Sequence, residues 1–160
     1  MKLAIDNSRK NGEISRERQQ STDEVFTNEY CTKILLKLCG EESFKAGNTF
    51  FEPSAGDGNL VEAVIRKKLE IGVSPTQALK DMYCIEYMKD NYDFLCQRIL
   101  NIVGDTKEHR DIISYNFAYA NTLDPNDRSE GRRYPEWMDD YVAPVVHINT
   151  TNSLLDIFDF

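Results

Sequence analysis

The chain has 160 residues, 41% of them hydrophobic and 29% charged, which is typical of one globular domain with a core of its own. The formal net charge is −8, so the chain is a poor non-specific binder of phosphate backbones, and contact with nucleic acid would need a local basic patch or a partner subunit. No apolar run approaches the ~20 residues that span a bilayer, and the first residues lack a signal-peptide core. We therefore expect a cytoplasmic protein that does not enter the membrane.

Neither the cysteines nor the histidines are spaced as metal ligands. Four cysteines form no CxxC pair and lie in apolar helix or strand patterns, which predicts buried free thiols in a reducing compartment. They are Cys31, Cys39, Cys84 and Cys96. His109 and His147 have no ligand-spaced partner, so no metal site is expected.

The chain is expected to consist of a polar N-terminal arm at 1–22 and one domain at 23–160. The arm is either a solvated tail or a segment that orders over a ligand or partner. The domain is predicted to begin with a helix at about 28–39, because Thr27 or Asn28 can cap it and apolar residues follow at helical spacing. These apolar residues, which we expect to pack on a sheet, are Tyr30, Ile34, Leu35 and Leu38.

The central part of the chain alternates between predicted strands and helices. Strands are predicted at about 49–52, 82–85 and 117–120, with Ile112-Ile113 counted toward the third, and helices at about 59–71, 74–80 and 89–103. This alternation predicts an α/β fold in which right-handed crossovers join parallel strands. After a polar loop at 122–136, a fourth strand is predicted at 143–149 and a helical turn or short strand at 153–160.

A glycine-rich loop follows the first predicted strand. Gly56 and Gly58 carry no Cβ, so the backbone can turn tightly there and approach a ligand closely. The free N–H groups at the start of the following helix would face whatever sits in the loop. The pattern predicts a cofactor-binding loop at the carboxyl end of a strand; the alternative is a purely structural turn, in which Asp57 caps the helix.

The predicted topology brings two further side chains to the same edge of the sheet. Glu86 follows the second strand, and its carboxylate can accept hydrogen bonds from both hydroxyls of a ribose. Asn121 follows the third strand, and its amide can pair with the edge of an adenine. The alternatives are a plain surface carboxylate at Glu86 and a turn residue at Asn121.

The segment Glu52-Pro53-Ser54-Ala55-Gly56-Asp57-Gly58-Asn59 resembles the S-adenosylmethionine-binding motif of class I methyltransferases. It is most similar to the form found in N6-adenine DNA methyltransferases and restriction-modification M subunits. Glu24-Val25-Phe26-Thr27 resembles the Phe-Thr-Pro segment ahead of their first strand, and Ile85-Glu86-Tyr87 lies where they keep a ribose-binding acid. The resemblance covers residues 23–121 and implies a Rossmann-like fold with a mostly parallel sheet.

By this resemblance, S-adenosylmethionine is the expected cofactor. The residues implied to bind it are Phe26, Thr27, Glu52, Pro53, Ser54, Ala55, Gly56, Asp57, Gly58, Asn59, Glu86 and Asn121. The chain departs from the family pattern at two residues: Asn28 replaces the usual Pro after Phe-Thr, and Asn121 stands where many relatives have Asp beside the adenine.

The resemblance also implies methyl transfer to adenine N6, but the catalytic signature of that family is missing. Those enzymes carry Asp or Asn, then Pro-Pro and an aromatic residue, after the fourth strand; the nearest analogue is Asn149-Thr150-Thr151-Asn152. Asn149 could accept a hydrogen from the target amine, whereas Asn152 provides no ring to stack on a flipped base. Asn149 is therefore the candidate catalytic residue.

We expect the sheet to be truncated after the fourth strand, with an exposed apolar edge that favours a homo- or hetero-oligomer. Three functions stay open. The first is a DNA adenine methyltransferase that contacts DNA directly or through a partner subunit. The second is a non-catalytic methyltransferase-like module that acts as a binding or regulatory partner in restriction-modification. The third is methyl transfer to a protein or small molecule.

Overall fold

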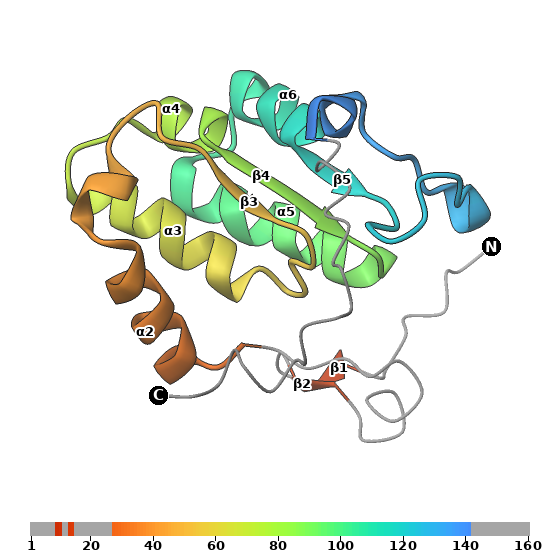
Figure 1. The fold of residues 1–160 in the computed structure, drawn as a ribbon, viewed down its shortest axis with the longest axis horizontal. Coiled ribbons are helices and arrows are strands. Elements are labelled where there is room, and N and C mark those ends of the chain that lie inside the picture. The colour runs from red at the N-terminus through yellow and green to blue at the C-terminus, as the bar shows by residue number, and fades with distance from the viewer. Residues whose placement is uncertain (1–8, 11–12, 15–26, 142–160) are drawn as a thin grey trace, which may run out of the picture.

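The computed structural model describes residues 9–10, 13–14 and 27–141 and shows an α/β fold around a parallel sheet (Figure 1). The sheet contains β3 (Phe50–Glu52), β4 (Met82–Glu86) and β5 (Phe117–Tyr119) in the order β3-β4-β5. Phe50 pairs with Met82, and Cys84 pairs with Phe117. The predicted α/β class with parallel strands is therefore confirmed for the described residues.

Helices precede, connect and follow these strands (Figure 1). The α-helices are α2 (Glu29–Cys39), α3 (Asn59–Glu70), α4 (Pro75–Lys80), α5 (Lys89–Val103) and α6 (Lys107–Asn116), and the 3-10 helices are η1 (Glu41–Phe44), η2 (Ser129–Gly131) and η3 (Glu136–Tyr141). Asn28 caps α2 by accepting a hydrogen bond from Cys31 N at 2.9 Å. Within the predicted arm the structure describes β1 (Arg9–Lys10) and β2 (Glu13–Ile14), which pair antiparallel.

The main hydrophobic core lies on the face of the sheet that α3, α4, α5 and α6 cover. The three strands lie side by side in sequence order. Since connections between parallel strands are right-handed, the helices of both connections lie on the same face of the sheet. Alternate strand residues point to that face, among them Phe50, Cys84 and Phe117. They pack with helical side chains such as Ile65 and Leu95, both fully buried.

A second, smaller cluster lies on the opposite face of the sheet. There Trp137 of η3 meets the rings of Phe51 and Tyr83 edge-on, with ring centroids 5.7 and 5.1 Å away. The Trp137 indole N–H donates to the Tyr115 carbonyl at 2.8 Å, so its polar atom is satisfied although the residue is buried. Ile85 of β4 is fully buried in the same cluster.

A buried ion pair ties the segment before β3 to the helical layer. Lys68 of α3 is fully buried and donates to the Lys45 carbonyl at 3.1 Å, the Asn48 carbonyl at 2.8 Å and the Asp81 carboxylate at 2.8 Å. Asp81 also accepts from Gly47 N at 3.0 Å and from the Gln77 amide at 2.7 Å. All three ammonium protons thus have an oxygen partner, as a buried cation requires.

The prediction that Ile112-Ile113 contribute to the third strand is wrong, because both residues lie in α6. Thr106 caps this helix by accepting a hydrogen bond from His109 N at 3.1 Å. The buried face of α6 contains the polar residues His109 and Asn116 beside Ile113. The helical spacing of apolar residues is therefore not visible in the sequence. The polar groups of His109 and Asn116 are satisfied: the His109 ring contacts the Gly104 carbonyl at 2.7 Å, and Asn116 donates to the Leu79 carbonyl at 2.9 Å.

The prediction that the apolar residues of α2 pack on the sheet is also wrong. The helix contacts α3 and η1, turning Thr32 and Leu36 toward the body of the protein. Its most apolar face points to solvent instead: Tyr30 is 74% exposed, Leu38 is 77% exposed, and Ile34 and Leu35 are each 41% exposed.

Two of the four cysteines are at least partly buried, and two are exposed. Cys84 is buried and Cys96 is partly buried, and this burial raises the pKa of the Cys84 thiol well above its ordinary value and that of Cys96 to about 11. Cys31 and Cys39 on α2 are exposed, so the prediction that all four thiols are buried is wrong for these two.

Some predictions fall outside the described residues, namely the fourth strand at 143–149, the segment 153–160 and most of the N-terminal arm. Among the residues that are described, no three side chains of His, Cys, Asp or Glu come together as metal ligands. None of the described helices is both long enough and apolar enough to cross a membrane.

Candidate cofactor-binding site

The glycine-rich loop joins the end of β3 to the start of α3, and both of its glycines adopt a positive φ. Gly56 has φ +57°, and Gly58, the N-cap residue of α3, has φ +88° in the left-handed region. A Cβ at Gly58 would lie 2.4 Å from Cδ1 of Leu95, a fully buried residue of α5. Gly58 is therefore required both by its backbone conformation and by the packing of α3 against α5.

The loop is fixed to β4 through hydrogen bonds. Ala55 N donates to the Ile85 carbonyl at 2.9 Å, and Gly56 N donates to Oε2 of Glu86 at 2.7 Å. Oε1 of Glu86 accepts from Met88 N at 2.7 Å. Glu86 is 5% exposed, so it is a buried anchor of the loop rather than a plain surface carboxylate. Oε1 also accepts from the Asn91 amide at 3.5 Å, so both carboxylate oxygens already serve the loop and the end of β4.

Asp57 ties the loop to α5. Its side chain is largely buried and lies 3.5 Å from Nη1 of Arg98, which also donates to the Asp57 carbonyl at 3.2 Å. Arg98 in addition pairs with Glu62 of α3. Burial alone would raise the pKa of Glu62, but hydrogen bonds and charges from Arg66 and Arg98 together hold it below its ordinary value. Arg98 of α5 thus holds both the loop, through Asp57, and α3, through Glu62.

The remaining predicted residues lie around the same loop. Oε1 of Glu52 accepts a hydrogen bond from Ser54 N at 3.1 Å, and burial raises the pKa of Glu52. Asn59 donates to the Thr27 carbonyl at 3.2 Å, which brings the start of α2 to the loop. Phe26 and Asn149 lie outside the described residues.

A cavity of about 520 Å³ opens at the carboxyl edge of the sheet, in the size range of small-molecule sites. Its walls come from the segments that follow all three strands, with Pro53, Ser54, Tyr87, Asn121, Thr122 and Leu123 as lining residues. The Thr122 hydroxyl donates to the Pro53 carbonyl and joins the outer two segments. A larger groove of about 790 Å³ lies along α6, away from the glycine-rich loop. The smaller cavity is the better candidate because it meets the loop and the strand ends.

Asn121 lines the cavity, but its amide is already used within its own loop. It donates to Oδ2 of Asp127 at 3.2 Å and accepts a hydrogen bond from Leu123 N at 3.0 Å. This arrangement matches the alternative role of a turn residue. Tyr87, Thr122 and Leu123 were not predicted as site residues, although each follows a predicted strand end closely in the sequence.

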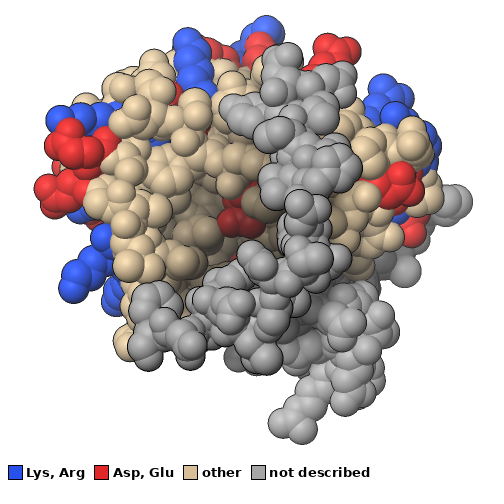
Figure 2. Space-filling model, in the orientation of Figure 1, with Lys and Arg blue, Asp and Glu red and all other residues tan. Residues whose placement is uncertain are grey.

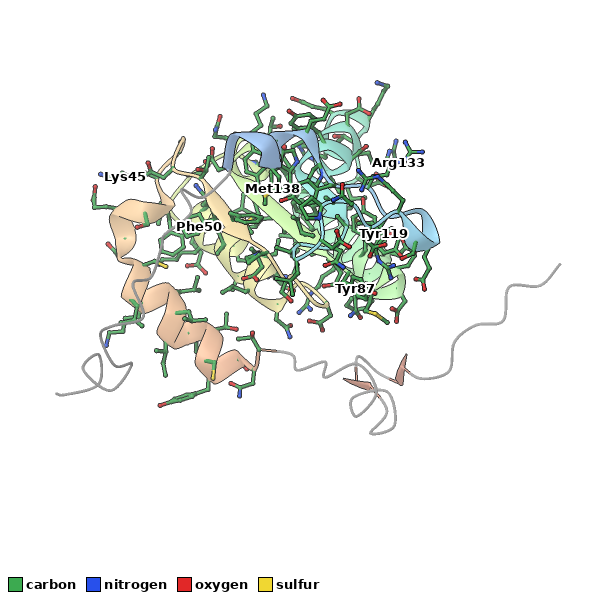
Figure 3. All side chains as sticks on the ribbon, turned by 45° about the vertical axis from the view of Figure 1, so that its right-hand side comes forward. Lys45, Phe50, Tyr87, Tyr119, Arg133 and Met138 are labelled. Atoms are coloured by element: carbon green, nitrogen blue, oxygen red, sulfur yellow. The ribbon has the colours of Figure 1, made fainter. Side chains whose placement is uncertain are left out.

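The pictures show how these residues are distributed. Figure 2 shows one face of the molecule with a hollow in its middle, acidic atoms at the floor of the hollow and most charged side chains at the rim. In Figure 3, Tyr87 and Tyr119 lie together at the carboxyl end of the strands, away from Lys45 and Phe50 at the other end. Tyr87 and Tyr119 therefore lie on the side where the cavity opens.

Comparisons with protein-family models, with curated proteins and with solved structures each give no match.

Proposed function

We propose that this chain binds S-adenosylmethionine in the cavity at the carboxyl edge of the sheet, as a methyltransferase-like domain of the DNA-modifying type. One observation carries the proposal: the segments that follow β3, β4 and β5 converge on a single cavity, and the buried carboxylate of Glu86, beside the cavity-lining Tyr87, fixes the glycine-rich loop through Gly56 N. The resemblance of Glu52–Asn59 to the cofactor motif of class I methyltransferases supports it, and so does the Rossmann-like strand order.

The proposed roles of the residues follow from their positions. The loop from Glu52 to Gly58 would lie against the cofactor, since its glycines leave room for close approach. Glu86 would accept hydrogen bonds from the ribose. Tyr87 and Asn121 would flank the adenine. When bound, the sulfonium group supplies the methyl group and the driving force, and the protein contributes mainly binding and orientation.

A second candidate is a non-catalytic module that binds the cofactor and serves a partner in restriction and modification. The net charge of −8 favours it, because an acidic chain gains little from the phosphate backbone of DNA. The two candidates share the cofactor site and differ in whether a methyl group leaves it.

Calorimetry of the full chain with S-adenosylmethionine tests the shared part of the proposal. We expect binding by the wild type and loss of binding in Gly56→Val, because a branched side chain would enter the loop at a residue with positive φ. Gly72→Val is the matched control: Gly72 also has positive φ, but nothing lies within 4 Å of its Cβ position. Absence of binding by the wild type would contradict the cofactor proposal.

A radiolabel transfer assay separates the two candidates. An active enzyme transfers label from S-adenosylmethionine to adenine in duplex DNA, and Asn149→Ala should abolish the transfer. Unchanged activity in that variant would refute the role of Asn149. Binding of the cofactor without transfer to DNA, RNA or protein would favour the non-catalytic module.

A further inference from the structure

Tyr87 forms one wall of the candidate cavity and is held from behind by a buried arginine. It follows Glu86 directly at the end of β4, lines the cavity and is 46% exposed. The guanidinium carbon of Arg132 lies 3.8 Å from the centre of the Tyr87 ring, and Arg132 itself is 3% exposed. A planar guanidinium at this distance stacks on the ring and restricts its rotation.

Arg132 holds the backbone of Tyr87 as well as its ring. Its Nε donates to the Tyr87 carbonyl at 3.1 Å. Its Nη1 donates to the Ser129 hydroxyl at 2.7 Å, and its Nη2 donates to Glu130 at 2.9 Å. Each nitrogen of the guanidinium therefore donates to an acceptor. These hydrogen bonds fix the guanidinium plane against the Tyr87 ring.

The same arginine reaches the other wall of the cavity through Asp127. Nη1 of Arg132 lies 3.6 Å from Oδ2 of Asp127, the oxygen that also accepts from the Asn121 amide. Hydrogen bonds donated by the Ser129 hydroxyl and N–H, then the one from Asn121 and the charge of Arg132, hold the pKa of Asp127 below its ordinary value. One charged network thus connects Tyr87 and Asn121, and Arg132 does this without lining the cavity.

The loop that carries Arg132 is held in a costly backbone conformation. Glu130 has φ +54°, and it is the only non-glycine residue with a positive φ in the part of the chain described. Its carboxylate accepts from the Tyr119 hydroxyl at 3.2 Å and from Arg132. Such strain persists where surrounding contacts over-determine the conformation, and it is common at ligand sites.

We propose that Arg132 is a positioning residue: it fixes the Tyr87 ring as a flat wall of the cavity, against which a planar heteroaromatic base of the ligand stacks. The inference rests on the proposed function, in which that base is the adenine of the cofactor. Arg132 acts through Tyr87 and touches no ligand.

Affinity measured by calorimetry on the full chain, with S-adenosylmethionine and with adenosine as probes, tests this inference. Arg132→Lys keeps the charge but loses the planar group, so both affinities should fall about tenfold. Tyr87→Ala should lower both affinities by a similar factor. Tyr87→Phe keeps the ring, so its affinities should stay near those of the wild type. Arg133→Lys, an exposed neighbour, is the matched control and should bind like the wild type.

The double variant Arg132→Lys/Tyr87→Ala separates positioning from general stability. If Arg132 acts through the ring, the double variant binds as weakly as Tyr87→Ala alone; if the two losses multiply, the inference is overturned. Should Arg132→Lys fail to fold, Glu130→Ala removes one acceptor of the guanidinium at an exposed site and should give a smaller loss of affinity. Wild-type affinity in this variant would overturn the inference.

The result for the wild-type chain distinguishes this inference from the function on which it rests. If the wild type binds neither probe, both are overturned. If it binds and folded Arg132→Lys binds equally well, the positioning role alone is overturned.

Discussion

Gly58 is the residue at which the loop conformation and the core depend most directly on each other. Its φ of +88° excludes most side chains, and the space beside it is filled by Leu95. The sequence alone indicates why a glycine follows a strand here, because a tight turn into a helix favours it. It does not show that α5, more than thirty residues further along, also closes the space that a Cβ would occupy.

Gly58→Ala should lower the free energy of unfolding by about 2–4 kcal/mol, combining left-handed backbone strain with overpacking against Leu95. Gly104→Ala is the control, since Gly104 has φ +95° and nothing lies within 4 Å of its Cβ position. Gly104→Ala should lower the free energy of unfolding only by the cost of the left-handed backbone conformation, about 1–2 kcal/mol. Urea denaturation with unchanged m-values measures both. Equal losses would show that Leu95 gives way without cost.

At the scale of elements, the sequence predicted the type of each element where its buried face is apolar, as in α3, β4 and α5. It failed for α6, because His109 and Asn116 occupy inward positions and satisfy their polar groups by hydrogen bonds to other elements. A periodicity argument reads such positions as polar and outward. For α2 the spacing of apolar residues predicted the helix correctly. It did not predict the packing, because spacing alone does not show which element an apolar face contacts.

The pair Lys68 and Asp81 joins α3 to the turn between α4 and β4, and helical spacing predicts Lys68 on the outward face although it is fully buried. Asp81→Ala should lower the free energy of unfolding by about 3–5 kcal/mol, because it leaves a buried ammonium without its counter-charge. Asp111→Ala, which removes an exposed pair with Lys107 on α6, should change it by less than about 0.5 kcal/mol.

A double variant tests whether the charge itself is the cause. Lys68→Met/Asp81→Leu removes both charges, so it should be less destabilised than Asp81→Ala in the same denaturation experiment. If it is more destabilised, the hydrogen bonds that Asp81 accepts from Gly47 and Gln77 contribute more than the ion pair does.

At the scale of the whole molecule, the parallel sheet separates two hydrophobic clusters. Tyr83 and Ile85 belong to the cluster around Trp137, whereas Met82 and Cys84 on the same strand belong to the main core. The sequence predicted the parallel sheet and the edge at which the cavity opens. It could not predict Trp137, since nothing in the spacing of a polar loop shows that it returns across the second face.

Trp137 is the only tryptophan in the sequence, and its fluorescence should therefore report on the smaller cluster. We expect the urea transition followed by Trp137 fluorescence to coincide with the transition in far-UV circular dichroism, because β4 contributes to both clusters. Trp137→Phe provides the fluorescence background from the eight tyrosines. An earlier fluorescence transition would show that the second face opens before the helical layer unfolds.

The sequential strand order also has a consequence for the way the chain acquires its structure. β3, α3 and β4 need no residue beyond Glu86 to pair, and Glu86 itself closes the glycine-rich loop through Gly56 N. During synthesis from the N-terminus, the half of the candidate site that contains the glycine-rich loop can form before β5 has left the ribosome. The wall that carries Asn121 is added afterwards, together with the loop that supplies Arg132. The unit of β3, the glycine-rich loop, α3 and β4 would then fold early, held by the hydrogen bond between Gly56 N and Glu86. Strand β5 would pair with β4 of this unit afterwards.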